Sequence, residues 1–204
     1  MDMVTQVPTY SALPRHRHAL GRDQVRSVQR ARVLRAAAEA VVDKGYGKVT
    51  IGDIVRRAQV STKTFYELFD DKESAFLAVY DDLDDLIDQV EVGAGDPRER
   101  LHETLTAALG LLDAEPHLTR MLAIDAMGGG PTILARRNQA LRKLAALVAA
   151  VLGREPDDML IMAYLGGTAE LVVQHVTGPL PDLAAEVHRF TDALFFPTSR
   201  RPSR

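Results

Sequence analysis

The fold of this chain is decided by residues 50–69, which read TIGDIVRRAQVSTKTFYELF. Thr50 with Asp53 three residues later, and Ser61 before a second apolar segment, are typical first residues of helices. Their side chains accept hydrogen bonds from backbone amides that a helix start leaves unpaired. The stretch therefore predicts two short helices, about 51–58 and 62–69.

A tight turn at Gln59-Val60 joins these two predicted helices. Apolar residues sit at the spacings that let the helices pack together: Ile54, Val60, Phe65 and Leu68. Two short packed helices after a longer basic one are typical of a helix-turn-helix, whose second helix can lie in the DNA major groove. The first turn of that second helix offers Thr62, Lys63 and Thr64, which suit phosphates and base edges.

Outward from this motif, apolar residues recur at helical spacing, and no segment alternates convincingly with period two. A long helix is expected from about Asp23 to Gly45. Later helices are expected at about 70–90, from 97 to the break at Pro116, and then at about 116–127, 131–152, 158–176 and 182–196. We therefore predict an all-α fold of about nine helices. Residues 1–20, with no sustained periodicity, are expected to be a flexible basic arm.

Composition excludes several classes of protein. Of 204 residues, 46% are apolar and 26% charged, which is ordinary for a globular chain and unlike a disordered or collagen-like one. There is no cysteine, so disulfides, thiolate metal sites and cysteine nucleophiles are excluded. The densest apolar run, 159–165, is short of the roughly 18 residues that suggest a membrane span. We expect a cytoplasmic protein that does not enter the membrane.

Charge is unevenly distributed along the chain. Residues 1–65 contain 12 Lys and Arg against 5 Asp and Glu, although the whole chain has a net charge of −3. A basic end on an acidic body indicates that this end meets a polyanion. A basic disordered tail is the alternative interpretation. The acids on the outer side of the predicted 70–90 helix are interpreted as a solvated face: Asp81, Asp82, Asp84, Asp85 and Asp88.

Residues 25–80 resemble the TetR family of bacterial transcriptional regulators. The resemblance is carried by Val33-Leu34, Ala37-Ala38, Gly45-Tyr46, Thr50-Ile51, Ile54-Val55 and Val60-Ser61. Its most specific part is TFYELF at 64–69, followed by Lys72-Glu73. Three positions depart from the family pattern: Gln59 stands where glycine is usual, Val55 where a small residue is common, and Lys63 where glycine is frequent.

The resemblance implies a DNA-contacting set made of Thr50, Ser61, Thr62, Lys63, Thr64, Tyr66, Glu67 and Lys72. Of these, Tyr66 and Lys72 are expected to contact phosphates, and Lys63, Thr64 and Glu67 to read bases. It also implies a helix-turn-helix DNA-binding domain at 21–72 and a ligand-binding and dimerisation domain at 73–204. A partly buried Tyr66 and a solvated Lys72 are the structural alternatives.

The C-terminal residues agree in part with this implication. The predicted 158–176 helix is apolar nearly all round, so we expect it to be buried on two sides, by its own core and by a second subunit. The candidate residues of the dimer interface are Leu165, Gly166, Val173, Leu183, Val187, Phe190 and Leu194. Candidates for an adaptable apolar ligand pocket are Met121, Met127, Met162 and His175, although ordinary core packing explains each methionine as well.

These observations predict a dimeric transcriptional regulator that binds double-stranded operator DNA, most simply a repressor released by a small hydrophobic ligand. No nucleophile–base pair, metal-ligand spacing or cofactor loop points to an enzyme, and no metal or cofactor is expected. The alternative is a helical enzyme or small-molecule carrier with an incidental basic N-terminal end.

Overall fold

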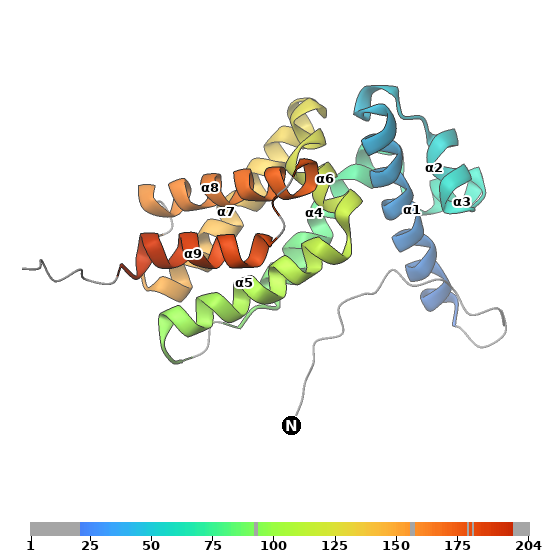
Figure 1. The fold of residues 1–204 in the computed structure, drawn as a ribbon. Helices are drawn as coiled ribbons and strands as arrows, with labels where there is room; N and C mark the ends of the chain where they lie inside the picture. The colour runs from blue at the N-terminus through green and yellow to red at the C-terminus, as the bar shows by residue number, and fades with distance from the viewer. Residues whose placement is uncertain (1–20, 92–93, 156–157, 179, 181, 198–204) are drawn as a thin grey trace, which may run out of the picture. The chain divides into compact units, whose positions relative to one another are not determined.

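The computed structural model describes residues 21–91, 94–155, 158–178, 180 and 182–197 (Figure 1). Within these ranges the chain forms nine α-helices, two 3-10 turns and no strand, which confirms the all-α prediction. The predicted arm, residues 1–20, lies outside them. The α-helices are α1 (Arg22–Lys44), α2 (Ile51–Ala58), α3 (Thr62–Leu68), α4 (Lys72–Asp88), α5 (Pro97–Ala114), α6 (Pro116–Ala123), α7 (Pro131–Leu152), α8 (Met159–Thr177) and α9 (Leu183–Phe195).

The chain divides into two compact units, residues 1–79 and 80–204. The boundary falls within α4, which continues as one helix through it. In the first unit, α1 packs against α2 and α3. The core there is made of residues that are almost wholly buried, among them Val33, Leu34, Ile54, Phe65 and Phe76. The first unit is therefore a small helical domain in which α1 supports the two helices of the predicted motif.

The start of α4 differs by one residue from the sequence-based expectation. We expect Asp70 to cap this helix together with Glu73, but Asp71 does so. The Asp71 carboxylate accepts from the Ser74 amide at 2.7 Å, and the Ser74 hydroxyl accepts from the Asp71 amide at 3.0 Å. Asp70 and Asp71 are both plausible caps in sequence, and in the structure the reciprocal bonds with Ser74 belong to Asp71.

In the second unit, α5, α7, α8 and α9 enclose an apolar core around Tyr164 of α8, which is completely buried. Its hydroxyl lies 2.8 Å from that of Thr191 on α9, so the one polar atom that the ring brings into the core is paired. A second apolar cluster joins α5, α8 and α9 through Leu109, Val172, Leu183 and Val187. Each of these helices is thereby fixed by at least two neighbours.

The acidic side of α4 is only partly a solvated face. Arg136 of α7 donates to Asp81 and Asp84 at 2.9 Å each, and the ammonium of Lys143 donates to Asp88 at 2.6 Å. Asp84 and Arg136 are largely buried, with 16% and 14% of their side chains exposed. The interpretation as solvated was therefore wrong for Asp84, whereas Asp81 and Asp88 remain 63% and 65% exposed. The basic residues that fold against these three aspartates lie 52 to 55 residues further along the chain.

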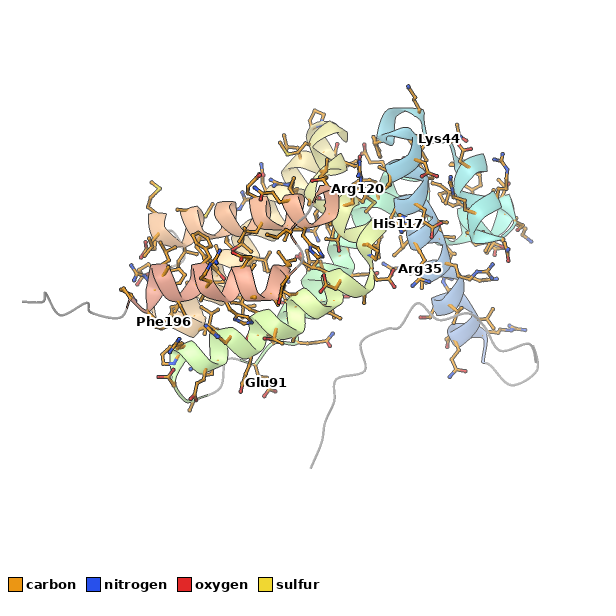
Figure 2. The ribbon with its side chains drawn as sticks, in the orientation of Figure 1. Arg35, Lys44, Glu91, His117, Arg120 and Phe196 are labelled. Atoms are coloured by element: carbon orange, nitrogen blue, oxygen red, sulfur yellow. The ribbon has the colours of Figure 1, made fainter. Side chains whose placement is uncertain are left out.

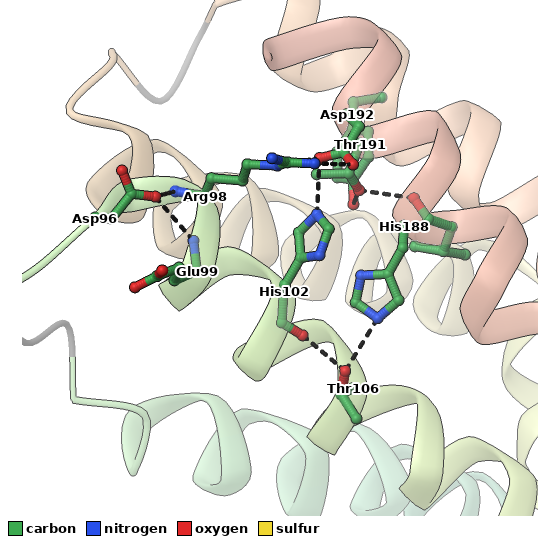
Figure 3. Close-up of polar contacts among 10 residues, drawn as sticks. Asp96, Arg98, Glu99, His102, Thr106, His188, Thr191 and Asp192 are labelled. Carbon is green, nitrogen blue, oxygen red and sulfur yellow. Dashed lines mark hydrogen bonds and ion pairs between the residues drawn. The ribbon is translucent and has the colours of Figure 1, made fainter.

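A chain of polar groups links α5 to α9 (Figure 3). The guanidinium of Arg98 donates two hydrogen bonds to Asp192, at 2.8 and 2.6 Å, and His102 bonds the same carboxylate at 2.9 Å. The His188 ring lies against His102, with centroids 4.3 Å apart, and contacts the Thr106 hydroxyl at 3.0 Å. Arg98 lowers the pKa of Asp192 to about 2, and burial lowers that of His188.

Helix α8 is apolar over more of its length than the seven-residue run suggests. By length and composition alone, Met159–Thr177 could cross a membrane, with a mean hydropathy of 1.3, and it is the one such helix among the described residues. Ile161, Tyr164 and Val172 bury one side of it in the second unit. The other side is open: 81% of Met159 and 43% of Met162 are exposed.

Candidate nucleic-acid interface

Helix α2 begins in a closed set of hydrogen bonds. The Thr50 hydroxyl accepts from the Asp53 amide at 3.2 Å, and the Asp53 carboxylate accepts from the Thr50 amide at 3.1 Å. Lys44, at the end of α1 (Figure 2), donates to the same carboxylate at 2.6 Å. The Lys44 bond, followed by those of Thr50, holds the pKa of the Asp53 carboxyl well below its usual range. The predicted capping pair is confirmed.

The turn between the two helices is made by Gln59 in a left-handed conformation, with φ 53° and ψ 43°. Among the described residues it is the only non-glycine residue with positive φ. Glycine adopts this conformation freely, whereas a side chain there costs about 1 kcal/mol. The turn that the resemblance implies is therefore kept in this chain despite the unfavourable residue.

Helix α3 is capped by Ser61, whose hydroxyl accepts from the Thr64 amide at 2.9 Å. Its inner side is held by Phe65, which is fully buried. The Phe65 ring packs edge-to-face against the Tyr66 ring and at a tilt against the Phe69 ring. Phe65 and Phe69 both belong to the buried core. A helix of only seven residues is marginal alone, so this anchor and the cap fix its position.

The outer side of α3 carries most of the predicted DNA-contacting residues. Ser61, Thr62, Lys63, Tyr66 and Glu67 are exposed and Thr64 is half-buried. Tyr66 has 55% of its surface exposed, which argues against the core alternative. Lys63 and Glu67 lie one turn apart with their charged groups at 3.7 Å, in side chains 86% and 59% exposed. Solvent screens such a pair strongly, so both groups remain available to another molecule.

Lys72 is placed differently from the other predicted contacts. Its ammonium donates to the backbone carbonyls of Tyr46 and Val49, at 2.9 and 3.1 Å, and lies 4.6 Å from the centre of the Tyr46 ring. An ammonium has three N–H donors, so these bonds leave one for a phosphate. Lys72 therefore ties the start of α4 to the segment before α2, whatever else it contacts.

Sequence reasoning missed the residues that fix α2 on α1. Lys44 bonds Asp53, and Arg57 forms an ion pair with Asp43. Both pairs join the last turn of α1 to α2, so they hold the helix-turn-helix at one angle to its support. A basic residue at a helix end followed by an acid in the next helix start is the only sequence signal for them, and it is weak.

The candidate ligand residues of the second unit lie in unlike surroundings. Met121 is fully buried, whereas 61% of Met127 and 43% of Met162 are exposed. Both ring nitrogens of His175 are engaged, Nε2 with Asp113 and Nδ1 with the Leu180 carbonyl, at 2.9 Å each. His175 thus joins α8 to α5 and to the segment before α9, and Met162 faces outward with the open side of α8.

The candidate dimer residues also separate into two groups. Leu183 and Val187 are at most 1% exposed and belong to the chain's own core, so they present no surface to a second copy. Phe190 packs on Tyr164 within the chain, with ring centroids 5.4 Å apart. The remaining candidates are half-buried or exposed: Leu165, Gly166, Val173 and Leu194.

The two adjacent glycines of α8 have different neighbours. A Cβ on Gly167 would lie 2.7 Å from the Phe190 ring, so this glycine admits α9 of the same chain. A Cβ on Gly166 would meet nothing within 4 Å. Gly166 continues the open side of α8 that Met159, Met162 and Ala163 begin.

These features define a class of protein: a capped, core-anchored helix-turn-helix with a polar outer helix, followed by a larger helical unit. Comparisons with known proteins agree. The family model described as "Bacterial regulatory proteins, tetR family" matches residues 33–79. An uncharacterized HTH-type transcriptional regulator of Mycobacterium tuberculosis is 27% identical over 172 residues, which is 80% of this chain and 90% of that protein.

Solved structures show the same fold over nearly their whole length. The fatty acid degradation regulator FadR from Bacillus halodurans has a TM-score of 0.70 at 18% identity, covering 85% of this chain and 97% of its own. FadR from Bacillus subtilis, in complex with stearoyl-CoA, has a TM-score of 0.66 at 18% identity, covering 81% and 97%. The helix-turn-helix segment of this chain is thus similar to that of the TetR family, and the matching relatives are named as transcriptional regulators.

Proposed function

We propose that this chain is a homodimeric repressor that holds operator DNA through α3 and releases it when a small hydrophobic ligand binds in residues 73–204. The observation that carries the proposal is the outer side of α3. Its exposed polar side chains stand on a helix whose position is fixed by a serine cap and a buried phenylalanine. A fixed helix with a free polar face suits recognition in the major groove.

The residues of this face divide by role. Lys63, Thr64 and Glu67 read base edges, because they lie on successive turns of the side of α3 that points away from its core. Tyr66 holds a phosphate through its hydroxyl, since it is exposed and lies on the same helix. Ser61, Thr62 and Thr50 contribute at the helix starts. Lys72 adds one N–H to a phosphate while its other two keep α4 in place.

A second copy of the chain covers the open side of α8. An exposed apolar stripe on a helix is unfavourable in water, and a twofold partner presents the same stripe in return. Met162, Ala163 and Gly166 form its centre, and Leu165, Val173 and Leu194 flank it. A dimer explains the apolar side of α8 better than a membrane helix does, because the other side of α8 is already buried in the core of the second unit. We accordingly propose action in the cytoplasm, on DNA.

The proposed ligand has an apolar body. Support comes from the apolar core of the second unit, in which Met121 is fully buried, and from the fold shared with a regulator whose structure was solved in complex with stearoyl-CoA. To release DNA, a ligand must favour a conformer in which the two α3 helices no longer match successive major grooves, roughly 34 Å apart. Helix α4 follows α3 and continues into the second unit, so a ligand that tilts α4 would move α3.

The experiment is operator binding by fluorescence anisotropy, with DNA from the flank of the protein's own gene. Lys63→Ala and Thr64→Ala should each cost about 1–3 kcal/mol and relax base preference at one position. Arg142→Ala, the loss of an exposed cation from α7, is the matched control and should bind as the unaltered chain does. Equal operator binding by all three variants would contradict the proposal that α3 reads bases in the major groove.

Ligand release is tested separately by calorimetry with stearoyl-CoA, in the presence and absence of operator, with coenzyme A alone as the control. Coupling between two sites is reciprocal, so operator should weaken stearoyl-CoA binding by the factor by which stearoyl-CoA weakens operator binding. Binding of stearoyl-CoA with no change of affinity on adding operator would refute release by this ligand. In that case the Lys63 and Thr64 variants would still test operator binding by α3.

A further inference from the structure

A cleft of about 270 Å³ lies between the first half of α1 and the part of α3 from Thr64 to Leu68. Helix α1 lines it with Arg22, Val25, Arg26 and Gln29, and α3 lines it with Thr64, Glu67 and Leu68. Both helices belong to the first unit, and two of the α3 residues also belong to the proposed base-reading face. The cleft therefore opens beside that face, on the side where α1 begins.

The cleft has a net positive charge. Arg22 and Arg26 contribute two cations, and Glu67 is the one carboxylate in its lining. That carboxylate already lies 3.7 Å from the ammonium of Lys63. Gln29 and Thr64 add neutral groups that can donate hydrogen bonds. The lining thus offers many more N–H and O–H donors than acceptors, which is the composition of an anion site.

One of the arginines is oriented by the protein itself. The Nη2 atom of Arg26 donates to the backbone carbonyl of Glu67 at 3.2 Å. A guanidinium carries five N–H donors, so four remain after this bond. The bond holds the head group at the last turn of α3, where a planar fork can receive two oxygens of one phosphate.

We propose that this cleft binds one phosphodiester group of the operator backbone, gripped by Arg22 and Arg26 together, next to the bases that α3 reads. The proposal rests on the proposed function, since the phosphate belongs to the DNA that α3 holds. The chain's own N-terminal segment is a poor occupant by charge. It contains Arg15 and Arg17, which repel the arginines of the cleft.

A phosphate contact has a distinct signature in salt. Each phosphate that a protein neutralises makes the slope of log K against log salt steeper by about 0.9. Arg26→Ala should therefore flatten the slope by about 0.9 and weaken binding to all DNA sequences alike. The double variant R22A/R26A should flatten it by the same amount and not by twice as much, because both side chains hold one phosphate.

Two controls separate this contact from other effects. Arg142→Ala removes an exposed cation from α7 and should leave the slope unchanged. Operator carrying a neutral methylphosphonate at a single position, scanned along the site, should identify one phosphate at which Arg26→Ala has no further effect. Thermal unfolding of each variant tests whether the first unit is still folded. Arg26→Lys keeps the positive charge, so the slope of log K against log salt should stay unchanged.

The outcomes distinguish this proposal from the proposed function. If the unaltered chain does not bind operator, both fail. If it binds and Arg26→Ala leaves the slope unchanged, only the cleft proposal is overturned. A loss that varies with base sequence, or a double variant with twice the single effect, also overturns it, because two separate phosphates or a base would then be the partners.

Discussion

Helices α3 and α8 each leave one side uncovered by their own chain, and the two uncovered sides differ in chemistry. The side left open on α3 carries Lys63, Tyr66 and Glu67, whose polar groups are stable in water. The side left open on α8 carries Met159, Met162, Ala163 and Gly166. The difference shows that exposure alone does not indicate the kind of binding site. An open polar face is stable in water without a partner, whereas an open apolar face is unfavourable in water unless a partner covers it.

The largest expected effect is on the apolar side. Ala163→Glu should place a charge in the proposed dimer interface, at a cost of several kcal/mol, so that light scattering shows monomers or aggregates. Operator affinity should collapse with it, because one half-site alone binds weakly. Ala163 is exposed in one chain, so the change tests the interface without disturbing the core.

The matched control is Ala107→Glu, which adds the same charge at an exposed alanine of α5. It should remain dimeric and bind operator normally. If the Ala163 variant were folded and dimeric as well, the interface would lie elsewhere and the comparison of the two helices would lose its basis.

The two glycines of α8 sharpen the comparison within one helix. Gly167→Ala should destabilise each chain by about 1–3 kcal/mol in urea unfolding, because the new Cβ would meet the Phe190 ring, which is itself packed on Tyr164. Gly166→Ala has free space in the single chain. It should therefore stabilise the single chain by about 0.5–1 kcal/mol, because alanine favours a helix interior over glycine, and it should change the dimer dissociation constant. Equal effects of both changes on unfolding would contradict this assignment.

On the polar side, the turn that positions α3 can be improved. Gln59→Gly should raise the free energy of unfolding by about 1 kcal/mol, because glycine adopts the observed positive φ without strain. The same change at Gln139, an exposed position in the interior of α7, should lower it by a similar amount. Urea unfolding of both variants measures the difference, and effects of the same sign would refute the strain at Gln59.

The smallest effect expected is on the pH dependence of the α5–α9 contact. Burial lowers the pKa of His188, so the stability it supports is present above its unfolded value near 6.5 and is lost as the pH falls below it. Asp192 has a pKa of about 2 in the fold against 3.8 unfolded. Its contribution is present above 3.8 and is lost as the pH falls towards 2.

Thermal melts between pH 8 and pH 2 should therefore decline in two stages. His188→Asn should remove the first stage, and Asp192→Asn should reduce the second, to which Asp53 also contributes because its pKa is lowered as well. Asp85→Asn, at an exposed position of α4, serves as the control and should leave both stages unchanged. A melting profile that is the same for all three variants would exclude this polar chain as the source of the pH dependence.

Much of the fold was predictable because its signals are local. The caps at Thr50 and Ser61, and the prolines that open α5 and α7, act within one helical turn, so the sequence predicts these starts correctly. The polar outer face of α3 follows from the same short stretch, since Phe65 has to be buried and the residues around it cannot be. The positive φ at Gln59 agrees with the resemblance, in which glycine is usual at this position.

What the tertiary structure decided depends on helices that meet from distant parts of the sequence. No spacing shows that Arg136 will neutralise Asp84, that Lys72 will bond carbonyls before α2, or that Phe190 will occupy the space beside Gly167. The sequence by itself determined that α8 is mostly apolar and that the outer residues of α3 are polar, because these properties depend only on the residue types in each segment. Only the packing determined which side of each helix is left open, since burial is a property of neighbours and not of the residue.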